Sequence, residues 1–315
     1  MKTAENTAME QAQKAMEQIR TVVVGKDTVL MWVLATILAG GHILLEDIPG
    51  VGKTTMAVAF SKALGLQYGR VQFTPDVLPS DITGYSVPDS ATGEMVYRPG
   101  AVVCNLFLAD ELNRATSRTQ SALLEAMEEN QVTVDGVAHL LPRPFTVIAT
   151  QNPTGAAGTQ LLPDSQMDRF TICLSLGYPS VADEKKMLLS RQGKNPMDAL
   201  TPCFTAQQLV ALQKTVADTY ISEDVVEYIV RLIDGTRRHK QILRGASPRA
   251  TLSVMAVSKA VAQLRGRDYV TPNDVQEVFL KIIPHRLLVT EAFQDKDRRP
   301  LLQEILRQVK APAIR

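Results

Sequence analysis

The stretch HILLEDIPGVGKTT, residues 42–55, decides the fold. Its apolar first half is typical of a buried strand, the Pro-Gly turn ends that strand, and a helix is expected to begin near Lys53. Gly50 and Gly52 let the backbone approach a phosphate closely, and the start of the helix adds a partial positive charge. This order of strand, glycine loop, Lys-Thr and helix predicts a phosphate-binding loop for ATP.

The residues of this loop have distinct expected roles. Lys53 would contact the β- and γ-phosphates, and the Thr54 hydroxyl would be a ligand of Mg²⁺. One position departs from the full pattern, which has glycine five residues before Gly52, where this chain has Asp47. Aspartate tolerates turn conformations better than most residues, so the loop can still form, and the sequence leaves open whether Asp47 only replaces a turn glycine or has an active role. The predicted loop also includes Pro49, Gly50, Val51 and Thr55.

Polar residues follow two further apolar runs. The run LFLA at 106–109 ends in Asp110, which would hold Mg²⁺ through water, and Glu111, which would orient and deprotonate the attacking water. The strand predicted at Phe145–Thr150 is followed by Asn152, which is placed to hydrogen-bond that water or the γ-phosphate. Asparagine before proline is also an ordinary turn signal. The functional interpretation of Asn152 therefore depends on its position directly after an apolar strand.

The composition indicates a folded protein of nearly neutral charge. The 315 residues are 45% hydrophobic and 21% charged, which excludes collagen-like, mucin-like and largely disordered classes. Thirty-four basic and 33 acidic residues give a net charge of +1, so no nucleic-acid partner is expected. Three cysteines form neither a metal-binding spacing nor a disulfide framework. Without a signal sequence or a membrane span, we expect a cytoplasmic protein with no membrane insertion.

The chain changes pattern near residue 179. Before it, short apolar runs alternate with helical stretches, which predicts a doubly wound parallel sheet of five strands. After it, amphipathic helices with N-cap signals predict a smaller all-helical domain. We therefore expect an α/β nucleotide-binding core at 1–179, with an N-terminal helix, and a helical lid at 180–315. The predicted strands are His42–Asp47, Tyr68–Thr74, Asn105–Asp110, Phe145–Thr150 and Thr171–Leu176.

Together these motifs resemble the AAA+ ATPases, and within them the MoxR family, over nearly the whole chain. LLEDIPGVGKTT is similar to the family's Walker A motif, LFLADELNRA to its Walker B motif and VIATQNP to sensor 1. The segment QVTVDGVAHLLPRPF is similar to the β-hairpin that precedes sensor 1. The resemblance begins at Val24 and Gly25, and it implies that these two residues also contact ATP.

Two arginines gain a role from the same resemblance. LPDSQMDRF is similar to the segment that carries the arginine finger, which falls on Arg169, and GASPRA to sensor 2, which falls on Arg249. A ring ATPase that hydrolyses only when assembled needs a cation from the neighbouring subunit, and the arginine fork of Arg169 suits phosphoryl oxygens. Arg249 starts a helix of the lid, so it could couple the position of the lid to the γ-phosphate. The alternatives are a surface ion pair of Arg169 with a nearby aspartate, Asp164 or Asp168, and an ordinary helix-end charge at Arg249.

The resemblance also implies how the ATPase works with other proteins. It implies a homo-oligomeric ring, expected to be a hexamer, that uses ATP and Mg²⁺ to remodel or mature client proteins, with a partner containing a von Willebrand factor A (VWA) domain. Residues 73–100 resemble the family's insert, which reaches the ring's centre or the substrate; a surface hairpin without function is the alternative. Two other functions stay open: a metal-chelatase-like motor subunit, and a nucleotide-gated scaffold with negligible turnover. Arg114 could reach a neighbouring site or pair locally.

Overall fold

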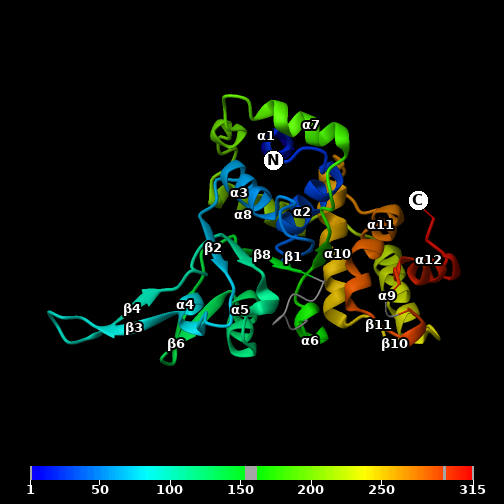
Figure 1. The fold of residues 1–315 in the computed structure, drawn as a ribbon. Coiled ribbons are helices and arrows are strands. Elements are labelled where there is room, and N and C mark those ends of the chain that lie inside the picture. Colours follow the sequence, from blue (N-terminus) through cyan, green and yellow to red (C-terminus); the bar gives the residue numbers. More distant parts are fainter. Residues whose placement is uncertain (1, 153–161, 294–295, 314–315) are drawn as a thin grey trace.

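The core of the chain is a five-stranded parallel sheet with the strand order β2-β5-β8-β1-β9 (Figure 1). It is seen in a computed structural model that describes residues 2–152, 162–293 and 296–313. The sheet confirms the predicted doubly wound fold. Its strands are β1 (Ile43–Glu46), β2 (Tyr68–Gln72), β5 (Leu106–Asp110), β8 (Thr146–Gln151) and β9 (Ile172–Leu174).

Two hydrophobic cores lie on opposite faces of this sheet, because successive side chains of a strand point to opposite sides. In β1, Ile43 and Leu45 pack into the first core, whereas Leu44 packs into the second. Burial on both faces explains why these strands are continuous apolar runs in the sequence. The longer helices of this domain that contribute to the two cores are α1 (Lys2–Val22), α2 (Asp27–Leu38) and α3 (Lys53–Ala63) for the first, and α5 (Ser117–Glu129) for the second.

Helix α2 is an element that the sequence does not predict. Leu30 and every residue from Trp32 to Leu38 are buried. A helix that is buried on nearly all sides lacks the apolar stripe by which an amphipathic helix is recognised. From the sequence alone, its apolar residues therefore look like a buried strand or a short core segment.

The insert at residues 73–100 contains a short helix, α4 (Pro79–Thr83), and a hairpin. In the hairpin, β3 (Gly84–Pro88) pairs antiparallel with β4 (Met95–Pro99). Helix α4 packs on α5, and the hairpin projects from the body of the molecule (Figure 1).

A second hairpin, β6 (Gln131–Val134) and β7 (Val137–Leu140), lies before β8, where the sequence predicts one. It contacts the insert through aromatic stacking. The Tyr97 ring of β4 lies parallel to the His139 ring of β7, with centroids 3.7 Å apart. The two hairpins are therefore joined by a specific side-chain contact.

The lid follows β9 and is helical as predicted except at one point, where the prediction of an all-helical domain is wrong. It contains a small two-stranded sheet, β10 (Ile242–Arg244) with β11 (Leu288–Val289), whose strands are too short to give an alternating sequence signal. Helix α10 packs on α2, and α11 on β9, so the lid extends the first core. The lid helices are α7 (Val181–Ser190), α8 (Ala206–Ala217), α9 (Glu223–Arg238), α10 (Pro248–Leu264), α11 (Pro272–Ile282) and α12 (Arg299–Gln308).

Short helical segments complete the described chain. Helix α6 (Asp164–Met167) precedes β9, and four 3-10 helices lie in loops. Over the described residues, no helix combines the length and the apolar character needed to cross a membrane. The 3-10 helices are η1 (Leu112–Arg114), η2 (Pro196–Ala199), η3 (Pro284–Arg286) and η4 (Glu291–Phe293).

Candidate ATP site

The predicted phosphate loop connects β1 to α3. Gly50 and Gly52 have φ angles of +86° and +99°, a region that favours glycine. A Cβ atom on either glycine would meet nothing within 4 Å, so the backbone conformation rather than space requires glycine there. Gly52 is also the N-cap of α3 and supplies no side-chain cap. The first N–H groups of α3 therefore lack side-chain partners and suit phosphate oxygens.

Lys53 lies at the centre of this loop and is half-buried. Its ammonium group donates hydrogen bonds to the carbonyl oxygens of Asp47, at 2.7 Å, and Ile48, at 3.2 Å. Burial lowers the pKa of Lys53, and the negative charges of Asp47, Asp110 and Glu111 oppose that shift. The structure therefore brings Lys53 close to the acidic pair, as the sequence predicts.

Asp110, at the carboxyl end of β5, is held by two neighbouring strands. The buried Thr150 of β8 donates its hydroxyl to Oδ1 of Asp110 at 2.8 Å, and Arg70 of β2 donates to Oδ2 at 2.8 Å. Both carboxylate oxygens already have a partner, which suits an outer contact to Mg²⁺ through water. Sequence reasoning missed Thr150 and Arg70; the only signal was that polar residues occur near the ends of adjacent strands.

Glu111 adopts a left-handed backbone with φ at +56°, which is uncommon for a residue other than glycine. Its amide donates to the Thr150 hydroxyl at 2.8 Å, which helps to hold this conformation. Arg114 donates to its carboxylate at 2.6 Å, so of the two roles left open for Arg114 the structure shows local pairing. Strained backbone of this kind is concentrated at functional sites.

Asn152 directly follows β8, which lies between β5 and β1 in the sheet. The Asn113 side chain donates to its carbonyl oxygen at 3.4 Å. Because the carboxyl ends of parallel strands meet at one edge of a sheet, Asn152 lies on the same edge as Lys53 and the acidic pair. Pro153, which follows it, lies outside the described residues.

Of the two interpretations left open for Asp47, the structure shows more than a replacement for a turn glycine. Asp47 has no positive φ, and its buried carboxylate accepts three hydrogen bonds from the segment that leads from β9 to the lid. The donors are the amide of Leu176 at 2.5 Å, the amide of Gly177 at 3.0 Å and the hydroxyl of Ser175 at 2.8 Å. Asp47 therefore connects the phosphate loop to the entrance of the lid.

Lys26 holds the same connecting segment through its carbonyl groups. Its ammonium donates to the carbonyl oxygens of Leu176, Gly177 and Tyr178 at 2.6, 3.1 and 2.8 Å. Lys26 follows the predicted ATP contacts Val24 and Gly25. The connecting segment is thus clamped between two parts of the candidate ATP site, a feature that the sequence does not reveal.

Gly25, which follows Val24, lies against the first turn of α7. Gly25 has φ at +74°, and a Cβ atom there would lie 2.3 Å from the Asp183 side chain. A cavity of about 540 Å³ lies next to this region and includes Thr55 of the phosphate loop in its wall. Its other lining residues come from the end of α1 (Val22) and from residues 191–197, after α7. The cavity therefore borders the phosphate loop through Thr55.

Arg169 lies at the opposite edge of the sheet. It precedes β9, where the Thr171 amide donates to the His42 carbonyl at 2.8 Å, just before β1 begins. Arg169 therefore lies at the amino-terminal edge of the parallel sheet, whereas Lys53 lies at the carboxyl-terminal edge. The structure does not bring these two predicted site residues together within one chain.

Arg249 lies beside Arg169, because both pair with Glu128 of α5. Arg169 Nε donates to Glu128 Oε2 at 2.9 Å, and Arg249 Nη2 donates to the other oxygen. Asp164 pairs instead with Arg244, and Asp168 accepts a hydrogen bond from Ser247 at 2.8 Å. The alternative that Arg169 pairs with either aspartate is therefore wrong. No sequence pattern indicated Glu128.

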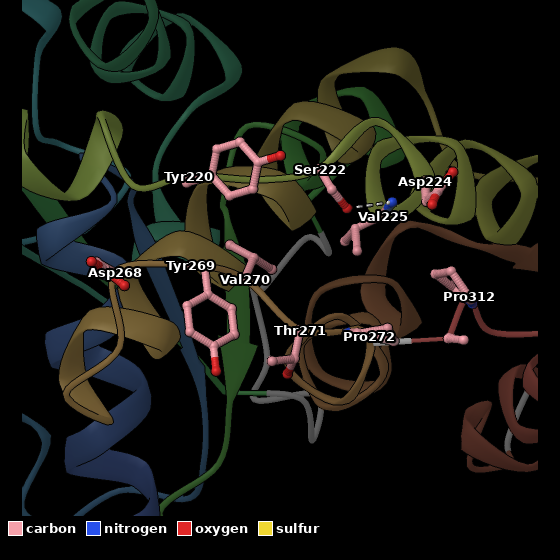
Figure 2. Close-up of a pocket in the computed structure, with 11 residues that line it drawn as sticks. Tyr220, Ser222, Asp224, Val225, Asp268, Tyr269, Val270, Thr271, Pro272 and Pro312 are labelled. Atoms are coloured by element: carbon pink, nitrogen blue, oxygen red, sulfur yellow. Dashed lines mark hydrogen bonds between the residues drawn. The ribbon is translucent and has the colours of Figure 1, made fainter. Parts of the chain in front are cut away.

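A separate cavity of about 580 Å³ lies in the lid, between the starts of α9 and α11. Figure 2 shows Tyr220 and Ser222 on one side of it and Tyr269 and Thr271 on the other. Its lining includes none of the predicted ATP-site residues.

The carboxyl-terminal edge fits a nucleoside triphosphate with Mg²⁺. The Thr54 hydroxyl has no hydrogen-bond partner among the described residues, and Asp110 lies at the same edge of the sheet, at the end of β5. Within the same residues there is no cluster of three or more histidine, cysteine or carboxylate groups that could hold a metal alone. A metal here would be shared between Thr54, Asp110 through water, and the phosphates.

Known proteins carry the same organisation. The model of the ATPase family associated with various cellular activities (AAA) matches residues 42–172, and the AAA lid domain model matches residues 234–308. Protein YeaC of Bacillus subtilis is 44% identical over 96% of this chain and 95% of its own length. Chaperone MoxR1 of Mycobacterium tuberculosis is 37% identical over 96% of this chain and 82% of its own length.

A solved structure extends this likeness to three dimensions. The crystal structure of an inferred ATPase from Cytophaga hutchinsonii has a TM-score of 0.91 and 33% identity, covering 99% of this chain and 98% of that one. The similarity to these proteins therefore includes both the sheet and the lid. The chain belongs to the MoxR family of AAA+ ATPases.

Proposed function

We propose that this chain hydrolyses ATP with Mg²⁺ in a homo-oligomeric ring, a hexamer as the resemblance implies, and that Arg169 and Arg249 complete the site of the neighbouring subunit. The observation that carries this proposal is the placement of the two arginines and of Lys53 at opposite edges of one sheet. A strand rises about 3.3 Å per residue, so the stretch from His42 to Asp47 alone separates the edges by roughly 16 Å. An arginine side chain cannot span that distance within its own chain.

Each residue of the carboxyl-terminal edge has a defined task in hydrolysis. Lys53 and the first N–H groups of α3 would bind the β- and γ-phosphates, while Thr54 and Asp110 would hold Mg²⁺, which supplies charge neutralisation when bound. Glu111 would take a proton from the attacking water, and Asn152 would orient that water. Arg70, Thr150 and Arg114 keep the two carboxylates in place.

The two arginines supply positive charge where negative charge develops on the γ-phosphate. Trans-supplied arginine fingers in other ATPases and GTPases are worth about 10³–10⁵ in rate. A free subunit would therefore bind ATP but turn it over slowly. This accounts for an intact acidic pair in a chain whose arginines cannot reach their own phosphate loop.

A mixing experiment tests the ring. Arg169→Ala should bind ATP but not hydrolyse it, and Lys53→Ala should not bind it. In a mixed ring, a Lys53→Ala subunit still offers Arg169 to a neighbour with an intact phosphate loop. Activity should therefore return when the two inactive variants are mixed under conditions of subunit exchange. The same result is expected when Arg249→Ala replaces Arg169→Ala.

Two results would contradict this assignment. The first is a mixture that stays inactive although light scattering shows mixed rings. The second is a monomer that hydrolyses ATP at the full rate at micromolar concentration with saturating ATP.

Client remodelling is the second part of the proposal. The β3–β4 hairpin carries exposed apolar side chains on a segment that projects from the body, namely Tyr85, Met95 and Val96. Isolated exposed apolar residues are common, but a projecting hairpin that bears several of them suits contact with another protein. The chaperone name of the mycobacterial relative supports this use, and a VWA-domain protein is the partner class that the resemblance implies.

A trap experiment tests the client contact. Glu111→Gln should bind ATP without hydrolysing it and so retain clients, which affinity capture and mass spectrometry would identify. Retention should require ATP, disappear in Lys53→Ala and fall when Tyr85→Ser is added to the trap. Equal retention with and without Tyr85 would exclude the hairpin as the contact.

The two alternative functions predict different outcomes. A nucleotide-gated scaffold would assemble with ATP but show negligible turnover in the wild type. A metal-chelatase-like motor would hydrolyse ATP and also support metal insertion into a small-molecule product when combined with its partner subunits. An ATPase assay of the wild-type ring therefore comes first.

A further inference from the structure

Glu128 contacts both arginines that are proposed to act on the neighbouring subunit. Glu128 lies in the last turn of α5, Arg169 precedes β9, and Arg249 lies in the first turn of α10 in the lid. One carboxylate oxygen accepts from Arg169 Nε at 2.9 Å and the other from Arg249. A single side chain thus joins the core and the lid at this point.

We propose that Glu128 is a positioning residue for ATP hydrolysis, which holds Arg169 and Arg249 side by side so that core and lid present them to the neighbouring subunit as one unit. The proposal rests on the function proposed above, because it assigns no role to Glu128 unless the arginines act in trans.

The contact geometry favours presentation of Arg169 over its sequestration. Arg169 uses only Nε in this contact, and among the described residues no partner is found for its two terminal nitrogens. Those nitrogens form the fork that matches two phosphoryl oxygens. A carboxylate that blocked the finger would be expected to occupy that fork itself. Arg249 differs, because it contacts Glu128 through its terminal nitrogen Nη2, so this argument concerns Arg169 alone.

Electrostatics explains why such a residue is needed. Two guanidinium groups that converge on one phosphate repel each other, and a carboxylate between them reduces that repulsion. The two arginines in turn lower the pKa of the Glu128 carboxyl, so the carboxylate stays ionised. Both arginines are about a third exposed on the same surface, with exposed fractions of 30% for Arg169 and 40% for Arg249.

The charges are also placed against the dipoles of their own helices. An acid at the end of α5 and a base in the first turn of α10 each have the unfavourable sign for that helix end. Exposed ion pairs of this kind contribute little to stability. Helix stability therefore does not account for this arrangement, whereas a role of Glu128 in positioning the two arginines does.

Kinetics of Glu128→Ala test the role, with Glu129→Ala as the matched control. Glu129 is the next residue of α5, is exposed and has no ion pair among the described residues. Misplacement of a catalytic group by about 1 Å can cost 10²-fold, so we expect Glu128→Ala to lower kcat at least about tenfold. ATP affinity and Tm should stay near the wild-type values, and Glu129→Ala should change none of the three. In an Arg169→Ala/Arg249→Ala background, Glu128→Ala should cause no further loss.

Mixing shows in which subunit Glu128 acts. Glu128→Ala with Lys53→Ala should regain activity, because the Lys53→Ala subunit supplies a correctly held pair of arginines. A Glu128→Ala enzyme as fast as the wild type, or faster, would overturn the proposal. So would failure of this mixture while Arg169→Ala with Lys53→Ala regains activity, since Glu128 would then act in its own chain. If both mixtures fail, the ring assignment fails and the role of Glu128 falls with it.

Discussion

The carboxylate of Asp47 accepts a hydrogen bond from the Leu176 amide at 2.5 Å, although 129 positions separate the two residues in the sequence. Asp47 opens the phosphate loop, and Leu176 lies on the path from the sheet to the lid. The two residues join the part of the molecule that would sense phosphate to the part that would move. An aspartate at this position therefore has a structural task that glycine could not perform.

Replacement of Asp47 tests that task. Asp47→Gly removes the acceptor of three hydrogen bonds, and the Leu176 amide it leaves behind is buried. An unsatisfied buried donor costs about 1–3 kcal/mol, so we expect the free energy of unfolding in urea to fall by that amount. Asp47→Asn keeps one acceptor oxygen and should lose less. Equal stability of Asp47→Gly and the wild type would show that the contact with Leu176 is dispensable.

Binding and chemistry should separate at Lys53 and Glu111. Lys53→Ala removes a charge-assisted contact to the phosphates and should abolish ATP binding in calorimetry. Glu111→Gln keeps the shape of the side chain but cannot accept the proton, so it should bind ATP and hydrolyse it at least about a hundredfold more slowly. Turnover of Glu111→Gln at the wild-type rate would remove Glu111 from the role of base.

Substitution of Thr150 tests whether its hydroxyl positions the acidic pair Asp110 and Glu111. Its hydroxyl accepts from the Glu111 amide and donates to Asp110, each at 2.8 Å. Thr150→Val keeps the volume but leaves both groups without this partner, so we expect kcat to fall about tenfold or more. Thr150→Ser retains the hydroxyl and should stay within about threefold of the wild type. If the valine and serine variants have the same kcat, the hydroxyl does not position the acidic pair.

The sequence predicts the sheet and the carboxyl-terminal edge well, because both follow from local patterns. The buried strands are apolar runs. Asp110 ends one strand, Asn152 directly follows another, and Lys53 follows the loop after a third. Parallel strands then bring these residues to one edge without further information. Helix α2 escapes prediction because burial on nearly all sides removes its amphipathic period.

Contacts between distant segments could not be predicted, because no local pattern encodes them. The sequence leaves the role of Asp47 open, because its partners lie near residue 176. Glu128 resembles any charged residue near the end of an amphipathic helix, and its two partners come from different domains. Such residues become visible only when the fold has set which segments meet.

His42 provides a test of burial that does not depend on ATP. It lies just before β1, where its Nδ1 accepts from the Val147 amide at 3.0 Å and its Nε2 contacts the Met127 carbonyl at 3.1 Å. The first contact requires an unprotonated Nδ1, so Nε2 carries the proton and donates to Met127. Burial lowers the pKa of His42 to about 4, although the bond to Met127 opposes this shift.

The sign of the pH dependence follows from that shift. The folded chain binds fewer protons at His42 than the unfolded chain, so stability is full above the unfolded pKa and is lost as pH falls from 6.5 toward 4. Between pH 7.5 and 5.5 this residue should cost the wild type about 1.3 kcal/mol. His42→Gln can keep both hydrogen bonds with a neutral side chain, so its free energy of unfolding in urea should fall by about that much less over the same interval. The difference between the two pH values is the measured quantity, because it cancels any constant loss of packing in the variant. An unchanged pH dependence in His42→Gln would mean that His42 is not held neutral by burial.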